Sequence, residues 1–246
     1  MAINKFLMKW ILELERDFKI LSNSQSIAEL GPQDLTSDLK ALLASNHGGI
    51  VDARDLYSHW GIQNYTSFDL FDPRAENVDL NVDLGRTDSW DIVTNFGTSE
   101  HLFNQFAFMK NCHDLTKTKG ITLHVVPISS GMDHGLINYH PTFFRSLAKA
   151  NNYEILNFRY VPFIVKQQES RKKSYCFVDL AKARTLTERR DIFMSKVKTV
   201  GNISNLRLLF NSSNFYHDFF LGDYIFVAFR KNSSKKFVTP IQERYL

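Results

Sequence analysis

The sequence predicts an α/β fold in which a mostly parallel β-sheet is covered by helices on both faces. Along the chain, short apolar runs with strand character alternate with longer stretches whose apolar residues recur every three or four positions. Such an alternation is typical of three-layer α/β proteins. The composition agrees, because 246 residues with 43% hydrophobic and 23% charged side chains are typical of a globular domain that needs no disulfides for its stability.

The predicted elements follow one another in a regular order. Apolar residues spaced along one helical face from Ile3 to Leu21 predict an amphipathic first helix, and we expect residues 1–23 to act as a lid. A strand at residues 26–30 is ended by a Gly-Pro turn. The remaining predicted strands are residues 65–71, 78–84, 90–96, 121–128, 153–161 and 224–229, and the remaining helices are residues 34–44, 53–60, 100–117 and 141–150.

One stretch interrupts the alternation. Residues 166–217 are polar and basic, with one predicted helix at residues 187–197 and one predicted strand at residues 206–210. Because the apolar strand at residues 224–229 restores the pattern, we interpret residues 166–217 as an insertion before the last strand. The whole chain, residues 1–246, is then predicted to be a single domain without internal repeats.

Charge is distributed unevenly along the chain. Residues 1–123 carry 11 Lys and Arg against 17 Asp and Glu, whereas residues 124–246 carry 19 against 9. A basic half indicates an anionic partner or substrate, a nucleic acid, or only a solvated basic face. No nucleic-acid motif with interleaved aromatic residues accompanies it. Binding to nucleic acid is therefore not expected, and the oligomeric state stays open.

Cysteine usage and hydropathy indicate a soluble protein of a reducing compartment. The two cysteines, Cys112 and Cys176, are too few for a secreted disulfide framework. Acidic residues follow the apolar patch near the N-terminus, and no signal-peptide cleavage pattern appears. No apolar run approaches the roughly 18 residues that span a bilayer. We therefore expect a cytoplasmic protein that neither spans nor binds a membrane.

Several catalytic signatures are absent from the sequence. It contains no Gly-x-x-x-x-Gly-Lys phosphate loop, no Gly-x-Gly-x-x-Gly fingerprint, no Gly-x-Ser-x-Gly elbow and no zinc-protease pair. Their absence argues against an ordinary nucleotide hydrolase, a dinucleotide oxidoreductase and an α/β hydrolase.

Polar residues instead gather where the predicted strands end. Ligands of parallel sheets bind beyond the carboxyl ends of the strands, and a carboxylate there can accept two hydrogen bonds from a ribose. Each residue taken alone is read equally well as a helix cap or an exposed loop residue, but four successive sets favour a site. The sets are Glu29 to Asp34, Asp69 with Asp72, Asp79 to Asn81, and Asn95 to His101.

The order of these sets resembles the class I S-adenosylmethionine-dependent methyltransferases, over about residues 24–163 and the closing strand. Ala28-Glu29-Leu30-Gly31-Pro32 is similar to the first motif of that family. Asp69 is similar to its ribose-binding acid, and Asp79-Leu80 to its adenine-contacting motif.

Two later segments extend the resemblance. Trp90-Asp91-Ile92-Val93-Thr94-Asn95 is similar to the fourth-strand motif, and the pair Glu100-His101 follows it. The Lys119-Gly120 turn resembles the fifth-strand Gly-Gly motif with one glycine lost. The resemblance implies a Rossmann-like three-layer αβα fold with a seven-strand, mostly parallel sheet and an antiparallel last strand.

The same resemblance implies S-adenosylmethionine as the cofactor. One departure is the first loop, which in the family usually holds two or three glycines and here holds Gly31 alone, followed by Pro32. Because S-adenosylmethionine has no phosphate, it does not need the glycine-lined approach that a pyrophosphate requires. The residues assigned to the cofactor are Glu29, Gly31, Gln33, Asp69, Asp79, Leu80, Asn95 and Gly97.

The methyl acceptor is expected beside the segments that follow the fourth and fifth strands. Methyl transfer from a sulfonium is an in-line displacement, so the enzyme mainly positions the acceptor, and a histidine can serve as base when the acceptor is a hydroxyl. Two further histidines, His113 and His124, fall inside a predicted helix and strand and are expected to be structural. No metal is expected, because the histidine spacing matches no metal motif. The candidate catalytic residues are His134, His101, Tyr139 and His140.

Together these patterns predict a methyltransferase that acts on an oxygen or nitrogen of a small molecule or glycan precursor. The basic C-terminal half of the chain favours an anionic acceptor. One alternative is a nucleic-acid or protein methyltransferase, favoured only by the basic half. Another is a binding module that keeps the fold without turnover, favoured by the reduced glycine loop. Fold alone does not decide among them.

Overall fold

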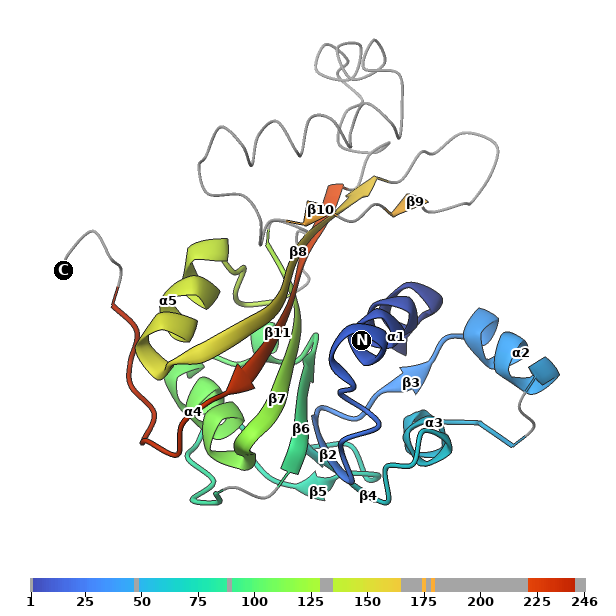
Figure 1. Cartoon of the computed structure of the whole chain (residues 1–246), viewed down its shortest axis with the longest axis horizontal. Coiled ribbons are helices and arrows are strands. Elements are labelled where there is room, and N and C mark those ends of the chain that lie inside the picture. The colour runs from blue at the N-terminus through green and yellow to red at the C-terminus, as the bar shows by residue number, and fades with distance from the viewer. Residues whose placement is uncertain are drawn as a thin grey trace, which may run out of the picture.

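The computed structural model describes residues 2–46, 49–87, 90–128, 135–164, 174–175, 178–179 and 221–241. Its elements form three layers around a central sheet (Figure 1). Helices α4 (Gln105–Leu115) and α5 (Pro141–Asn151) cover one face. The other face is covered by α1 (Lys5–Phe18), α2 (Ser37–Asn46) and α3 (Ala53–His59).

Seven strands make up the central part of the sheet, in the order β8-β11-β7-β6-β2-β4-β5. Strand β11 is antiparallel to both of its neighbours, and the strand pairs from β7 to β5 are parallel. This confirms the predicted fold class, including the antiparallel last strand. Two short strands, β9 (Ser174–Tyr175) and β10 (Val178–Asp179), extend the sheet beyond β8. The central strands are β2 (Ser26–Leu30), β4 (Asn64–Asp69), β5 (Glu76–Asn77), β6 (Trp90–Phe96), β7 (Thr116–Pro127), β8 (Tyr153–Ile164) and β11 (Leu221–Lys231).

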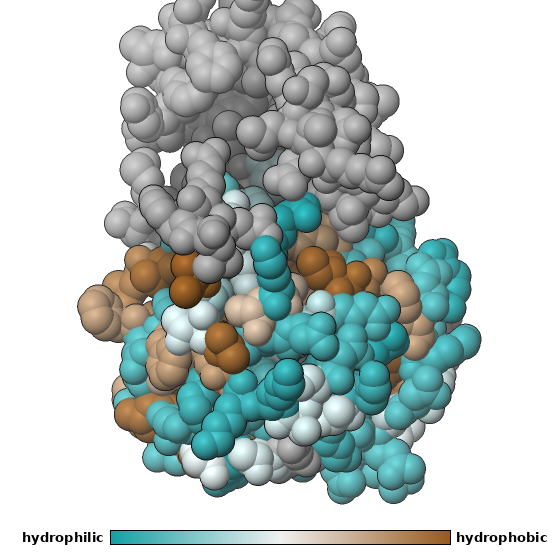
Figure 2. Space-filling view, turned by 60° about the vertical axis from the view of Figure 1, so that its left-hand side comes forward, coloured by the Kyte–Doolittle hydropathy of each residue, from teal (hydrophilic) through white to brown (hydrophobic). Residues whose placement is uncertain are grey.

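The core lies on both faces of the sheet. Successive strand side chains point to opposite faces, so Ile27 and Ile92 pack with α1, α2 and α3, while Ala28 and Val93 pack with α4 and α5. Burial on both faces explains why β2 is apolar without polar alternation. Seen from the side of α4 and α5, exposed hydrophobic side chains form separate patches among hydrophilic ones (Figure 2). Among the described residues, no helix is long and apolar enough to cross a membrane.

The first helix is shorter than the predicted range of residues 3–21. Asn4 caps its start by accepting hydrogen bonds from the N–H groups of Phe6 and Leu7, and Lys19 ends it with a left-handed backbone. The helix is packed onto the sheet, because Trp10 is buried and its ring centroid lies 5.1 Å from that of Phe226. The expected role of residues 1–23 as a lid stays a prediction.

Other predicted elements also differ from the structure. None of residues 78–84 forms the predicted strand, and the strand in this region is the preceding pair Glu76–Asn77. The chain turns because Asp79 accepts a hydrogen bond from the N–H of Asn81 (2.8 Å). The helix predicted at residues 100–117 is divided into a 3-10 turn, Ser99–His101, and α4, whose start is capped by Asn104.

The helix predicted at residues 34–44 also begins later than expected. Asp34–Leu35 forms a short strand, β3, which pairs in parallel with β1 (Ala2–Ile3) before α2 starts at Ser37. The helix predicted at residues 187–197 and the strand at residues 206–210 lie outside the described residues.

Candidate functional site

A cavity of about 430 Å³ opens at the carboxyl edge of the sheet. Strand β2 has β4 on one side and β6 on the other. The strand order reverses at this point, as it does at the ligand sites of other open α/β sheets. The loops that follow these strands supply the walls. The cavity is lined by Gly31, Pro32, Gln33, Asp69, Leu70, Phe71, Asp72, Val78, Asp79, Leu80, Asn81, Gly97, Thr98, His101 and Leu102.

Gly31 brings the backbone of the first loop close to the loop after β6. Its φ is +87°, and a Cβ placed there would lie 2.3 Å from Oγ1 of Thr98. The Thr98 hydroxyl also donates a hydrogen bond to the carbonyl of Leu30 (2.5 Å), so it is held in that position. Only glycine fits a close contact of this kind in this backbone conformation.

Glu29 lies beneath this loop and does not line the cavity. It is fully buried, and its carboxylate accepts hydrogen bonds from the hydroxyls of Tyr57 (3.0 Å) and Tyr65 (2.6 Å) and from the N–H of Gln33 (3.0 Å). Burial raises the pKa of Glu29 to about 7, although the three donors oppose the shift. The structure thus places Glu29 as a support of the loop.

Gln33 connects two of the cavity walls. Its side-chain Nε2 donates to the carbonyl of Gly31 (2.9 Å) and to that of Phe96 (3.2 Å), across the two loops. Because both neighbours are acceptors, the amide is oriented with its nitrogen toward them. The remaining oxygen, Oε1, is buried and has no hydrogen-bond partner among the described residues.

The two aspartates at the carboxyl end of β4, Asp69 and Asp72, have different surroundings. Oδ1 of Asp69 accepts hydrogen bonds from the N–H groups of Phe71 (2.8 Å) and Asp72 (2.9 Å) and so shapes its own loop. Asp72 instead pairs with Arg74 (2.6 Å), which holds the pKa of that carboxyl at about 2. Arg74 also reaches Asp34 (2.6 Å) and joins the loops after β4 and β2.

The segment after β5, which forms another wall of the cavity, is hydrogen-bonded to the residues at the start of α4. Asn81 accepts hydrogen bonds from the N–H groups of Phe103 (3.0 Å) and Asn104 (3.1 Å), and its own turn is held by Asp79. Leu80, next to both, is buried against the core beneath α4. Asp79 and Leu80 both line the cavity.

Asn95 lies inside the sheet and not in the cavity. It is fully buried, donates to Ser99 Oγ (2.9 Å) and contacts Nδ1 of His124 (3.1 Å). Burial lowers the pKa of His124 to about 3, so this imidazole is neutral and structural, as predicted. Gly97, two residues after Asn95, does line the cavity and has a φ of +73°.

Of the four candidate catalytic residues, His101 lines the cavity and is exposed. Tyr139 is buried, its hydroxyl donates to Gln105, and burial raises its pKa well above the ordinary value. The side chain of His140 caps α5 by accepting from the N–H of Thr142 (3.2 Å). Tyr139 and His140 therefore have structural partners away from the lining, and His134 lies outside the described residues.

Sequence patterns did not single out every lining residue. Phe71, which is 87% exposed, had no separate signal. Neither had Thr98, whose place depends on its contact with the distant loop at Leu30 and Gly31. For the ion pair of Asp72 with Arg74, the one signal in the sequence is that the two residues lie two positions apart. Among the described residues, no group of three or more His, Cys, Asp and Glu is placed to hold a metal ion.

Comparisons with known proteins concern the fold. No family model matches the sequence, and no curated protein is similar to it in sequence. The solved YcgJ protein of Bacillus subtilis superposes with a TM-score of 0.51 at 9% identity, over 91% of this chain and 100% of that one. This match and the strand order show a Rossmann-like three-layer αβα fold.

Two further solved structures have lower TM-scores. One is an S-adenosylmethionine-dependent methyltransferase of Archaeoglobus fulgidus, with a TM-score of 0.47 and 11% identity over 91% of this chain and 94% of that one. The other is a 1,6-didemethyltoxoflavin-N1-methyltransferase of Burkholderia thailandensis with bound S-adenosylhomocysteine, with a TM-score of 0.45 and 10% identity over 92% of this chain and 88% of that one.

Proposed function

We propose that this protein is an S-adenosylmethionine-dependent methyltransferase that acts on an oxygen or nitrogen of a small molecule or glycan precursor. The observation that carries the proposal is the cavity at the carboxyl edge, on the fold of class I methyltransferases, with six of the eight residues assigned to the cofactor in its lining. These six are Gly31, Gln33, Asp69, Asp79, Leu80 and Gly97.

The residues present fit the cofactor. Among the described residues, Oδ2 of Asp69 receives no hydrogen bond, because both loop N–H groups bind Oδ1, and it can accept from ribose hydroxyls. Oε1 of Gln33 is a buried acceptor for an ammonium group. Leu80 offers apolar contact for a purine, and Gly31 lets the backbone approach closely.

The cofactor, when bound, supplies an electrophilic methyl group. The protein then has to orient the acceptor, exclude water and, for a hydroxyl acceptor, remove a proton. We assign His101 to this role first, because its side chain lines the cavity. His134 stays a second candidate on the sequence alone. Tyr139 and His140 act indirectly, by holding the segment that leads into α5.

The test of the proposal is binding of S-adenosylmethionine and S-adenosylhomocysteine to the full chain by calorimetry. Binding should raise the melting temperature, since a ligand selective for the native state stabilises it. The absence of heat and of any thermal shift at millimolar concentrations of both compounds would contradict the proposal.

A substitution at Asp69 tests the ribose contact. In Asp69→Asn the side-chain oxygen still accepts from the loop N–H groups, whereas the charged acceptor for the ribose is lost. Affinity for S-adenosylhomocysteine should fall about ten- to a hundredfold. Asp72→Asn is the matched control, because the Asp72 carboxylate is already engaged by Arg74. If only the control loses affinity, the ribose acid is Asp72.

A binding module without turnover is a second candidate, favoured by the single glycine in the first loop and by the Gln33 side chain that fills part of it. Under this alternative the protein binds S-adenosylmethionine, but no methylated product forms with hydroxyl or amine acceptors. Product formation with any such acceptor would exclude it.

A further inference from the structure

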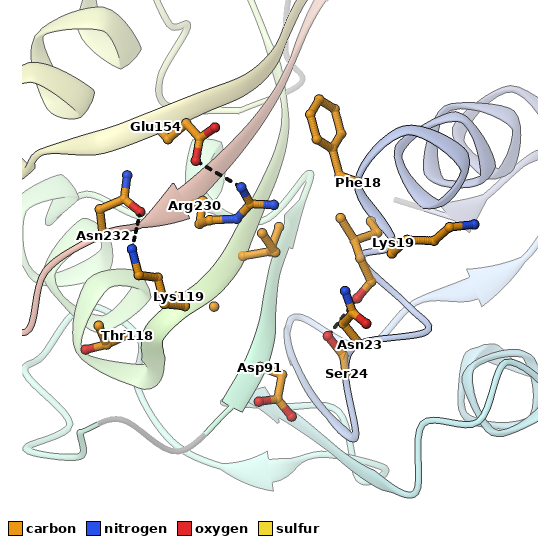
Figure 3. Close-up of a pocket in the computed structure, with 13 residues that line it drawn as sticks. Phe18, Lys19, Asn23, Ser24, Asp91, Thr118, Lys119, Glu154, Arg230 and Asn232 are labelled. Carbon is orange, nitrogen blue, oxygen red and sulfur yellow. Dashed lines mark hydrogen bonds and ion pairs between the residues drawn. The ribbon is translucent and has the colours of Figure 1, made fainter.

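A second cavity, of about 530 Å³, lies at the opposite edge of the sheet (Figure 3). Its walls are the end of α1 on one side and the amino ends of β6 and β7, with the end of β11, on the other. The parallel strands begin here, so the sheet separates this cavity from the one described above. None of the residues assigned to the cofactor lines it.

Two cationic side chains from neighbouring strands stand on one wall. Arg230 lies opposite Ile121 in the pairing of β11 with β7, and Lys119 lies two residues before Ile121. The Arg230 guanidinium points toward the wall formed by Phe18 and Asn23, whereas the Lys19 side chain points away (Figure 3). Lys119 donates to the neutral amide oxygen of Asn232 (3.1 Å), so its charge is not balanced by that contact.

The two carboxylates of the cavity leave room for a further anion. Asp91 is bound by the Ser26 hydroxyl (2.7 Å) and by Lys117 (2.9 Å), which balances its charge. Glu154 pairs with Arg230 (3.0 Å), but its side chain is 47% exposed. An exposed pair of this kind contributes little, and a guanidinium has further N–H groups with which to bind a second anion.

Backbone conformation provides an independent indication. Among the described residues, three that are not glycine have positive φ: Lys19 (56°), Lys119 (71°) and Asn152 (54°). Asparagine adopts this conformation readily, but lysine does so at a cost that glycine would avoid. Lys19 has this conformation because it ends α1, where a left-handed residue is common. Lys119 caps no helix, and it lines the second cavity. A strained backbone that carries a cation at a cavity wall favours a role for that cation.

We propose that the second cavity binds a small phosphorylated molecule whose phosphate is held by Arg230 and Lys119. A guanidinium binds phosphate oxygens in bidentate fashion, and an ammonium adds a point charge. The volume is in the range of small-ligand pockets, so the site accommodates more than the phosphate group. The proposal does not depend on the methyltransferase function, because the two cavities share no residue.

Pyrophosphate is the probe, titrated into the full chain by calorimetry in a buffer without phosphate. We expect saturable binding that is weakened at least tenfold in Arg230→Gln and in Lys119→Gly. The second variant removes the cation and at the same time relieves the left-handed strain, so its melting temperature without ligand should equal or exceed that of the parent. Glu154→Gln removes the competing carboxylate and should strengthen binding.

Asn152→Gly is the matched control, because it makes the same backbone change at the end of α5, at a residue that does not line the cavity. It should leave pyrophosphate affinity unchanged, and all four variants should bind S-adenosylhomocysteine as the parent does. The proposal is overturned if pyrophosphate does not bind at 10 mM, on the order of the weakest useful affinity, or if Lys119→Gly and Arg230→Gln bind it as well as the parent.

Discussion

Gly31→Ala is expected to destabilise the protein by about 2–4 kcal/mol. It should also displace Gly31 and Thr98, which line the carboxyl-edge cavity. The left-handed backbone accounts for about 1–2 kcal/mol of this loss. The rest follows because the new Cβ would lie 2.3 Å from Oγ1 of Thr98, and Thr98 cannot move without losing its hydrogen bond to the Leu30 carbonyl. Urea denaturation followed by circular dichroism measures the change.

Gly61→Ala separates the two contributions. Gly61 has a φ of +89°, almost that of Gly31, but no atom lies within 4 Å of the position of its Cβ. It should therefore show only the conformational cost, about 1–2 kcal/mol. In a Thr98→Ala background the penalty of Gly31→Ala should fall toward that value. Equal penalties for Gly31→Ala and Gly61→Ala in the parent would refute the steric explanation.

The glycine turn shows what the sequence could predict. A strand with every residue buried, followed by Gly and Pro, identifies the end of β2 and the position of the loop from local information alone. The same holds for β6 and for α5, whose periodicity and flanking residues agree with the structure to within a residue or two. These elements follow from contacts between neighbours in the sequence.

The strand predicted at residues 78–84 shows where local patterns fail. Val78, Leu80, Val82 and Leu84 alternate as a half-buried strand would. The chain instead turns at Asp79, which accepts a hydrogen bond from the N–H of Asn81. Asn81 in turn accepts from the N–H groups of Phe103 and Asn104, more than twenty residues away. An alternating pattern does not distinguish a strand from a loop that buries some of its apolar side chains in the core.

Glu29 illustrates the same limit within the site. A carboxylate at the end of the first strand resembles a ligand contact, and the sequence assigned it to the cofactor. Whether it faces the cavity or the core depends on Tyr57 and Tyr65, which come from α3 and β4 and reach its carboxylate from below. Their convergence is a tertiary event without a local signal, and it places Glu29 in the core beneath the loop, outside the lining of the cavity.

The burial of Glu29 predicts a specific dependence of stability on pH. Its pKa is raised from 4.5 to about 7 in the folded protein. The folded state therefore binds the proton more tightly than the unfolded state, so this group favours folding fully below pH 4.5 and loses that effect as pH rises to about 7. The loss amounts to roughly 3 kcal/mol across that window.

The groups that face Glu29 do not reverse this sign. Tyr57 and Tyr65 donate to it, and burial raises the pKa of both hydroxyls, so they stay protonated throughout. Asp52 adds a repulsive charge that raises the pKa of Glu29 further. Arg54 lies over the ring of Tyr65, 5.0 Å from its centroid, and contacts the tyrosine rather than the carboxylate.

Glu29→Gln should remove this dependence. The amide keeps an acceptor for the Gln33 N–H, and one tyrosine hydroxyl can rotate to accept from its nitrogen, so the variant should fold. The free energy of unfolding, measured in urea at steps from pH 4.5 to 7.5, should shift in favour of the variant by roughly 3 kcal/mol across the series. All other titrating groups cancel in the difference between the two proteins. Parallel curves for Glu29→Gln and the parent would mean that the folded protein does not perturb Glu29, and that its contacts with Tyr57 and Tyr65 do not hold it in the core.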